Sequence, residues 1–177
     1  ASFMQHPQQV LAIFDQERDE LHTEHFADSL TLVLDGVQDP GNLGTIIRIA
    51  DWFGITSVVC SRDTADIYNP KVVQSTMGSI ARIKTFYTDL KEFISTLPAG
   101  TPVYGTLLEG ENIYSQELTG NGLIVMGNEG KGISPEIRQL ISRGIRIPNY
   151  PPGRETADSL NVAVATAIVC AEFRRKQ

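Results

Sequence analysis

The sequence contains few of the residues that build covalent or metal-based sites. Its two cysteines, Cys60 and Cys170, lie far apart, and its three histidines, His6, His22 and His25, crowd the N-terminus. Without cysteine partners the histidines do not form a zinc-ligand pattern. A disulfide is open in principle, but the apolar neighbours of both cysteines favour buried thiols in a cytoplasmic protein. We therefore expect no metal site and two free thiols.

Long apolar runs and an excess of positive charge are also missing. No run approaches the roughly 20 residues of a membrane span, and the N-terminus ASFMQHPQQV lacks the basic start and apolar stretch of a signal peptide. The net charge of −6 argues against a general nucleic-acid coat, because phosphate binding depends on Lys and Arg. A local basic patch stays possible. These absences favour a cytoplasmic protein without a membrane partner.

The 177 residues, 41% of them hydrophobic, suit one globular domain with a sizeable core. Residues 1–30 differ from the rest in their abundance of Gln, His, Asp and Glu. We interpret them as a short strand at 10–14 followed by an acidic linker or helix, the tail of a missing RNA-binding domain. Residues 31–177 then form the main domain.

From residue 31 onward, apolar runs alternate with helical patterns. The expected strands are 31–35, 57–60, 81–86, 102–106, 122–126 and 145–147, and the expected helices are 43–53, 69–78, 88–97, 134–142 and 159–175. Asn69 and Ser134 each precede a proline, which is typical of a helix start. This alternation predicts an α/β fold, a mostly parallel sheet with helices on both faces.

Ligands of such sheets bind in the loops after the carboxyl ends of the strands. The loop DPGNLGTIIR (39–48) places glycines before a helix N-terminus, as anion sites do. Arg48 then lies on a helix face with Thr45, Asp51 and Trp52, either as a surface partner of Asp51 or as an anion contact. A nucleotide-binding enzyme is a further alternative, but the dinucleotide fingerprint G-x-G-x-x-G is absent.

The loop GNEGKGIS (127–134) combines three glycines with a carboxylate. It is not a P-loop, because Lys131 is followed by Gly132 rather than by Ser or Thr. Glycines let a backbone pass close to a ligand. Glu129 does not suit a phosphate cradle, but it suits contact with a cation or a hydroxyl. A solvated surface glutamate is the alternative.

The stretch SLNVAVATAIVCAEF opens the last expected helix with polar residues. Ser159 suits a helix cap, whereas Asn161 at the third position needs partners if it is buried. The helix is apolar on nearly every side. Such a helix is buried in its own core and against something else, for which a second copy of the chain is the simplest partner.

These three stretches together resemble the SpoU, or TrmH-like, family of RNA ribose methyltransferases. The motifs are N-x-G-x-x-x-R at 42–48, GLIVMGNEGKGIS at 122–134, and IP…SLNVAVA at 147–165, so the resemblance covers residues 31–173. It implies an α/β sheet with a C-terminal deep trefoil knot. It also implies a homodimer through the last helix and the helix after Asn42.

The resemblance further implies that S-adenosylmethionine donates a methyl group to a ribose 2′-hydroxyl of tRNA or rRNA. The residues that match the family's catalytic positions are Asn42, Arg48, Glu129, Ser159 and Asn161. Those that match its cofactor pocket are Thr106, Leu107, Gly127, Asn128, Glu129, Gly132, Ile147, Pro148, Ser159 and Leu160. The chain departs from the family in Asn149 and in the longer path 149–158 between IP and SLN.

We expect Arg48 to act as a phosphate clamp and electrostatic activator, because a guanidinium stays protonated in proteins. Glu129 and Asn161 are expected to fix one another. Whether Arg48 serves its own or the partner's site stays open. The alternative function is a catalytically inactive dimer of the same fold that binds cofactor and RNA.

Overall fold

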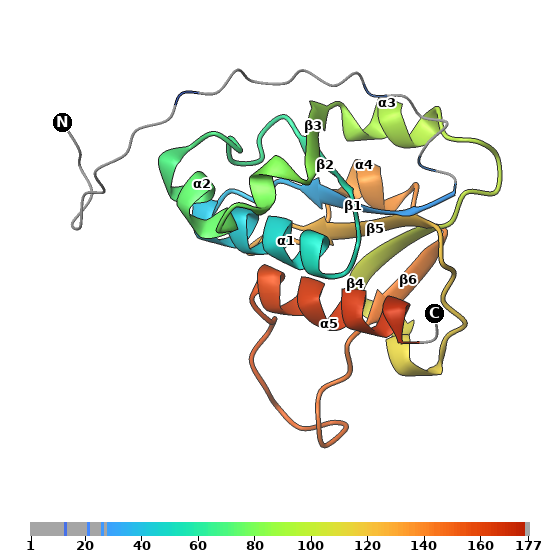
Figure 1. Cartoon of the computed structure of the whole chain (residues 1–177). Coiled ribbons are helices and arrows are strands. Elements are labelled where there is room, and N and C mark those ends of the chain that lie inside the picture. Colours follow the sequence, from blue (N-terminus) through green and yellow to red (C-terminus); the bar gives the residue numbers. More distant parts are fainter. Residues whose placement is uncertain (1–12, 14–20, 22–25, 27, 176–177) are drawn as a thin grey trace.

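A six-stranded parallel sheet forms the centre of the computed structural model, which describes residues 13, 21, 26 and 28–175. Its first strand, β1 (Leu30–Asp35), lies in the middle and is buried on both faces. The spatial order is β3-β2-β1-β5-β4-β6 (Figure 1). The other strands are β2 (Ser57–Ser61), β3 (Lys84–Thr88), β4 (Val103–Asn112), β5 (Gly122–Gly127) and β6 (Arg143–Arg146).

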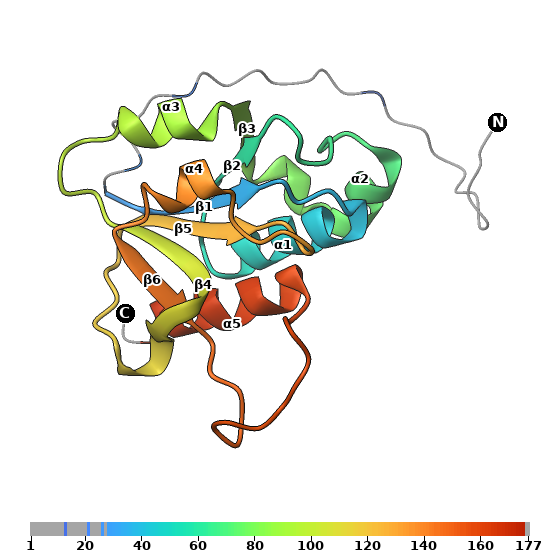
Figure 2. The same cartoon turned by 180° about the vertical axis from the view of Figure 1, so that it is seen from behind.

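Helices cover both faces of this sheet, as the alternating pattern predicted. On one face lie α1 (Pro40–Trp52), α2 (Pro70–Thr76) and α5 (Val162–Arg174), and on the other lie α3 (Leu90–Ser95) and α4 (Pro135–Arg138) (Figures 1 and 2). Each layer has its own apolar core. In β1, for example, Leu32 faces the α1 layer and Val33 faces the α3 layer, because successive side chains of a strand point to opposite faces.

The start of α2 follows its sequence signal, whereas α1 begins at Pro40, before the predicted start at residue 43, and Ser134 acts differently from the expected cap. The Asp39 carboxylate accepts a hydrogen bond from the Asn42 amide at 2.8 Å, and Asn69 accepts one from the Lys71 amide at 2.9 Å. Ser134 precedes a proline as Asn69 does, yet its hydroxyl makes no capping bond. Its backbone N–H instead donates to Asp35 at 2.7 Å, so this helix start is tied to the end of β1.

Four predicted helices are shorter than expected, among them 69–78 and 88–97, where α2 has 7 residues and α3 has 6. The helix predicted at 134–142 ends at Arg138, because the chain then tightens into turns and Ser142 pairs with Val103 beside β6. The helix predicted to open at Ser159 begins at Val162. Asn161 is its cap, and the exposed Ser159 and Leu160 belong to the preceding loop. The interpretation of Ser159 as a helix cap is therefore wrong.

One predicted strand also shifts. The run 81–86 was expected to be extended from its first residue, but the short 3-10 turn η2 (Ser79–Ala81) occupies that position, and β3 begins at Lys84. A second such turn, η3 (Ile113–Ser115), follows β4.

The first and last helices of the α1 layer lie side by side and run in the same direction. At one end Asn161 donates to Asn42 at 2.9 Å. At the other end Arg174 donates to the carbonyl of Phe53 at 2.8 Å. This arrangement brings the N-termini of α1 and α5 to one edge of the molecule, where the carboxyl ends of the strands also lie.

The N-terminal predictions fall almost entirely outside the described residues, including the strand at 10–14. Phe26 is described, and it packs edge-on against Phe86 and Phe93 on the α3 side. No helix within the described part of the chain is long and apolar enough to cross a bilayer. The threading of a trefoil knot stays a prediction.

Candidate active site

The three motif loops meet where β1 and β5 end. The chain leaves β1 toward β2 on one side, whereas β5 and β4 lie on the other. Such a switch in strand order opens a crevice at the carboxyl ends. The loop before α1, the loop after β5 and the loop before α5 all lie at this end of the sheet (Figure 1).

Asn42 is the central residue of the site. Its side-chain N–H donates to Glu129 Oε1 at 2.9 Å, and its side-chain oxygen accepts from Asn161 Nδ2 at 2.9 Å. Glu129 and Asn161, which follow Asn42 by 87 and 119 positions in the sequence, therefore both bond to its side-chain amide. Glu129 and Asn161 were expected to fix one another, and the structure links them through Asn42, which lies between them.

The capping of α5 determines the direction of each hydrogen bond among Asn161, Asn42 and Glu129. Asn161 Oδ1 accepts from the backbone amides of Ala163 and Val164, at 3.0 and 3.2 Å. The Asn161 amide therefore has only its N–H groups left to face Asn42. Asn42 in turn presents its oxygen to Asn161 and its N–H to Glu129, which suits an ionised carboxylate that only accepts. We call this set, Asn161–Asn42–Glu129, the amide relay.

The loop after β5 is held rigidly beneath the relay. Asn128 accepts from the amides of Gly130 and Lys131, at 2.9 and 3.0 Å, and donates to the carbonyl of Gly36 at 2.7 Å. A Cβ on Gly127 would lie 2.3 Å from the backbone carbon of Gly132. Only glycine permits this approach, so the loop folds back on itself at a fixed place.

Sequence reasoning missed two residues that anchor these loops to the sheet. Asp35 at the end of β1 accepts from Ser134, and Ser61 at the end of β2 accepts from the Gly36 amide at 2.8 Å. Both are polar residues in the last position of a buried strand. A polar residue at the last position of an apolar strand was the signal in the sequence that could have identified them. It distinguishes them from the residues of the loops that follow.

Arg48 lies on the exposed side of α1, away from the relay. Asn42 and Arg48 are six residues apart, which turns their side chains about 120° from one another around the helix. Asp51 does not pair with Arg48, since Arg82 binds it at 2.6 Å and Ser79 donates to it at 2.7 Å. The hydrogen bonds from Arg82 and Ser79 lower the pKa of the Asp51 carboxyl. Within the described residues, no hydrogen bond or ion pair occupies the Arg48 guanidinium.

Several residues expected to hold a cofactor lie in, or just after, three adjacent strands. Thr106 lies in β4 and bonds to the Val125 carbonyl at 3.1 Å, Gly127 ends β5, and Ile147 follows β6. Leu107, Ile147 and Pro148 are only partly buried. Leu160, adjacent to the relay, leaves 52% of its surface in water. Partly covered apolar side chains beside a rigid glycine loop suit the ring and ribose of a nucleoside.

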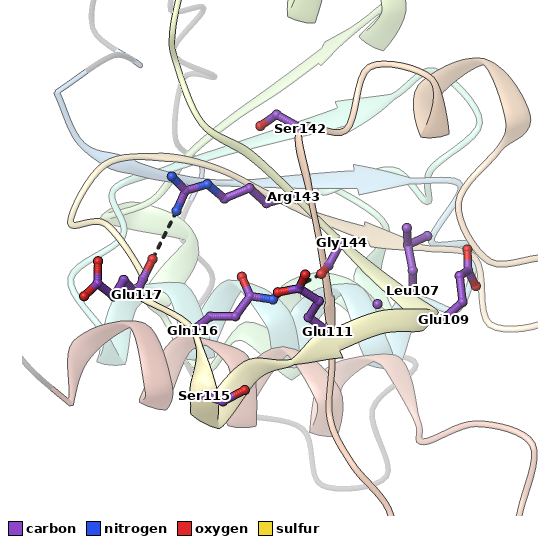
Figure 3. A pocket seen from close by; sticks show the side chains of 10 residues that line it. Leu107, Glu109, Glu111, Ser115, Gln116, Glu117, Ser142, Arg143 and Gly144 are labelled. Carbon is purple, nitrogen blue, oxygen red and sulfur yellow. Dashed lines mark hydrogen bonds between the residues drawn. The ribbon is translucent and has the colours of Figure 1, made fainter.

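A separate cavity of about 560 Å³ lies at the edge of the sheet, between β4 and β6 (Figure 3). Of the predicted site residues, only Leu107 lines it. Its acidic side chains are Glu109, Glu111 and Glu117, and Arg143 bonds to the Glu117 carbonyl at 3.1 Å. The excess of carboxylates makes this cavity a poor site for phosphate.

The cysteines take no part in the site. Both are free and buried, as expected, and burial raises the pKa of Cys170 to about 12. Neither thiol ionises at neutral pH, so neither serves as a nucleophile. Among the described residues no cluster of His, Cys, Asp and Glu could hold a metal ion.

Comparison with known proteins gives consistent results. The profile of the SpoU rRNA Methylase family matches residues 29–171. The chain is 36% identical over 170 residues to 23S rRNA (guanosine(2553)-2'-O)-methyltransferase RlmP of Bacillus subtilis, covering 95% of this chain and 65% of that protein. The curated relatives are therefore longer than this chain.

Two solved structures share the fold. One is a Porphyromonas gingivalis protein assigned to the TrmH family of RNA methyltransferases, with 44% identity and a TM-score of 0.76, over 85% of this chain and 61% of that one. The other is an AdoMet-bound rRNA methyltransferase of Sinorhizobium meliloti, with 34% identity and a TM-score of 0.77, over 88% and 59% of the two chains.

Proposed function

The chain belongs to the SpoU rRNA Methylase family, and on that premise we propose that it transfers a methyl group from S-adenosylmethionine to a ribose 2′-hydroxyl of tRNA or rRNA. The amide relay is the observation that carries this proposal. It joins Asn42, Glu129 and Asn161 from three separate motifs at the crevice of a parallel sheet.

The protein's share of the reaction is binding, orientation and electrostatics. S-adenosylmethionine supplies an activated methyl group on a good leaving group, whereas the 2′-hydroxyl is a weak nucleophile at neutral pH. The chain must therefore align the hydroxyl oxygen and help its proton to leave. Arg48 binds the phosphate beside the target ribose and stabilises negative charge that develops on the oxygen. That phosphate then accepts the proton.

The rigid glycine loop and its neighbours form the cofactor pocket. Backbone groups of Gly127–Gly132 approach the ligand closely, while Thr106, Leu107, Ile147, Pro148 and Leu160 supply the walls. The polar residues at its rim are Asn128, Glu129 and Ser159. The approach of Gly127 to Gly132, which excludes any larger residue, supports this assignment.

A homodimer through α5 and α1 completes the site. In α5 the side chain of Val164 is 51% exposed, and it shares a face with the partly buried Ile168 and the exposed Ala171. On α1, Trp52 is 85% exposed. Exposed or partly exposed apolar side chains that share a face of α5, together with Trp52 on the neighbouring α1, support an interface with a second copy.

RNA recognition depends on more than this domain. The whole chain has a net charge of −6 and binds RNA weakly on its own, and residues 1–30 link residues 31–177 to an RNA-binding domain. The greater length of the relatives supports this division. The enzyme works in the cytoplasm, where its substrates are found.

The test uses labelled S-adenosylmethionine with unmodified total RNA. The RNA is separated by size, and the labelled nucleotide is checked for resistance to alkaline cleavage, which a 2′-O-methyl group confers. We expect label on one RNA class in an alkali-stable dinucleotide. Label on a base would contradict the proposal. The alternative, an inactive binding dimer, would be favoured if calorimetry shows cofactor binding but neither this chain nor an N-terminally extended version transfers a methyl group.

A further inference from the structure

The segment 149–158 is the part of the site that the proposed function does not explain. It lies between the residues assigned to the cofactor pocket, Pro148 on one side and Ser159 on the other. Every residue from 149 to 160 is exposed. Figures 1 and 2 both show this segment leaving β6, extending away from the body beneath α5, and returning to the start of that helix.

Among the described residues, the hydrogen bonds found for this segment all lie within it. Asn149 Nδ2 donates to the Arg154 carbonyl at 3.1 Å and to Thr156 Oγ1 at 3.4 Å. The Arg154 amide donates to the Pro151 carbonyl at 3.2 Å, and Gly153 takes a positive φ of 80°. The segment is therefore a closed turn that Asn149 fastens at its base.

This turn displays two side chains that have no partner in the described chain. Tyr150 is 87% exposed, which leaves a large aromatic surface in water. The Arg154 guanidinium is exposed, and no hydrogen bond or ion pair is found for it among the described residues. Because the turn spans only a few residues, the two side chains project from one small loop.

An aromatic ring and a guanidinium suit single-stranded RNA. Unpaired bases stack on aromatic rings, and arginine binds phosphate or stacks on a base. The turn also carries Glu155 and Asp158, so net charge does not draw RNA to it. The contact must come from stacking, with one phosphate held by Arg154.

We propose that Tyr150 stacks on an unpaired base of the substrate RNA next to the target nucleotide, and that Arg154 binds an adjoining phosphate. This inference rests on the proposed function, since it places the RNA at the same crevice. The enzyme then selects a single-stranded or looped region, because the base must leave its helix to reach the ring. A partner subunit and the cofactor are the competing occupants of the turn.

The first experiment compares Tyr150→Ala and Arg154→Ala with the parent chain in the methyl-transfer assay on total RNA. Tyr150→Ala is expected to raise the KM for RNA about tenfold, the order of one lost base stack, with the KM for S-adenosylmethionine unchanged. Tyr150→Phe retains the ring and restores the parent value. Tyr114→Ala, which removes a half-exposed ring on η3, serves as the matched control and has no effect.

The second experiment observes the contact directly. A Trp52→Phe, Tyr150→Trp chain carries a single tryptophan, because Trp52 is the only native one, and its fluorescence can be excited apart from that of the tyrosines. A twelve-nucleotide single-stranded RNA of mixed sequence is expected to quench it, and the same sequence as a duplex is not. Arg154→Ala should reduce the slope of log affinity against log salt by about one unit.

The outcomes separate this inference from the proposed function. Transfer by the parent chain with an unchanged KM for RNA in Tyr150→Ala overturns the inference alone. A change confined to the KM for S-adenosylmethionine shows a cofactor lid, and a change of oligomeric state by light scattering shows a subunit contact. Either result overturns it. Absence of transfer by the parent chain counts against the proposed function, and the quenching measurement still tests the turn.

Discussion

Asn161 makes two kinds of contact with one side chain. Its oxygen caps α5, and its N–H group donates to Asn42. The sequence predicted that this residue needs partners if it is buried, because it was placed at the third position of an apolar helix, whereas the structure makes it the exposed cap of α5. The sequence did not indicate which groups those partners are, since the two hydrogen bonds depend on how α1 and α5 pack.

Substitutions at Asn161 should separate the two contacts. Serine keeps a capping oxygen but is too short to reach Asn42, whereas alanine removes both contacts. We expect Asn161→Ser to keep the melting temperature and to lower transfer. Asn161→Ala should also lose about 1 kcal/mol of stability, or about 2–4 °C in a chain of this size. Thermal unfolding and single-turnover rates measure both, and equal unfolding temperatures for the two variants would contradict the capping role.

Arg48 should affect the chemical step and not cofactor binding. Its guanidinium is exposed and has no partner among the described residues, and Asp51 is bound to Arg82. We expect Arg48→Ala to lower the transfer rate about 100- to 1,000-fold, as for other lost groups that stabilise developing charge. Calorimetry should give an unchanged affinity for S-adenosylmethionine. Lys91→Ala on α3 is the control, and an equal loss of rate and affinity in Arg48→Ala would exclude the clamp.

At the scale of elements, most of the fold could be predicted. Buried parallel strands are continuous apolar runs, and Asn69 before Pro70 marks a helix start by its side-chain chemistry. The errors fall where tertiary contacts override local pattern. The helix after Ser134 ends early because Ser142 pairs with Val103, and a local sequence pattern does not contain that pairing.

The glycine loop offers a matched pair of substitutions. A Cβ on Gly127 would collide with the backbone of Gly132, whereas a Cβ on Gly130 would meet only Asn128 Oδ1 at 3.7 Å. We expect Gly127→Ala to abolish measurable binding of S-adenosylmethionine, since the loop must open to relieve the collision. Gly130→Ala should bind within a few-fold of the parent chain. Isothermal calorimetry of both variants is the measurement, and similar affinities would show that the loop does not hold the cofactor.

At the scale of the whole molecule, the exposed apolar face of α5 predicts a dimer. A glutamate at Val164 would place a charge on that face, where contact with a second copy would remove it from water. We expect Val164→Glu to be monomeric by light scattering at micromolar concentration. Ala99→Glu adds the same charge at an exposed position after α3 and should leave the dimer intact. A dimeric Val164→Glu chain would place the interface elsewhere.

The proposed dimer would also decide which site Arg48 serves. Within one chain, Asn42 faces Glu129 and Asn161, while Arg48 projects about 120° away around α1. From this direction the Arg48 guanidinium does not reach the amide relay of its own chain. It lies on the exposed face of α1, beside the exposed apolar face of α5 that we propose meets a second copy. We therefore expect each Arg48 to act on a substrate held mainly by the partner.

Mixed dimers test this directly. Arg48→Ala and Gly127→Ala chains are each expected to be inactive alone. When they are unfolded together and refolded, a dimer with one chain of each kind holds one intact cofactor pocket, and the chain opposite that pocket carries an intact Arg48. If arginine acts across the interface, that pocket transfers methyl groups, so the mixture regains activity that neither variant has. If arginine acts within its own chain, every site has one defect and the mixture stays inactive. Arg48→Ala mixed with Arg48→Ala,Gly127→Ala should be inactive under either arrangement, which controls for refolding.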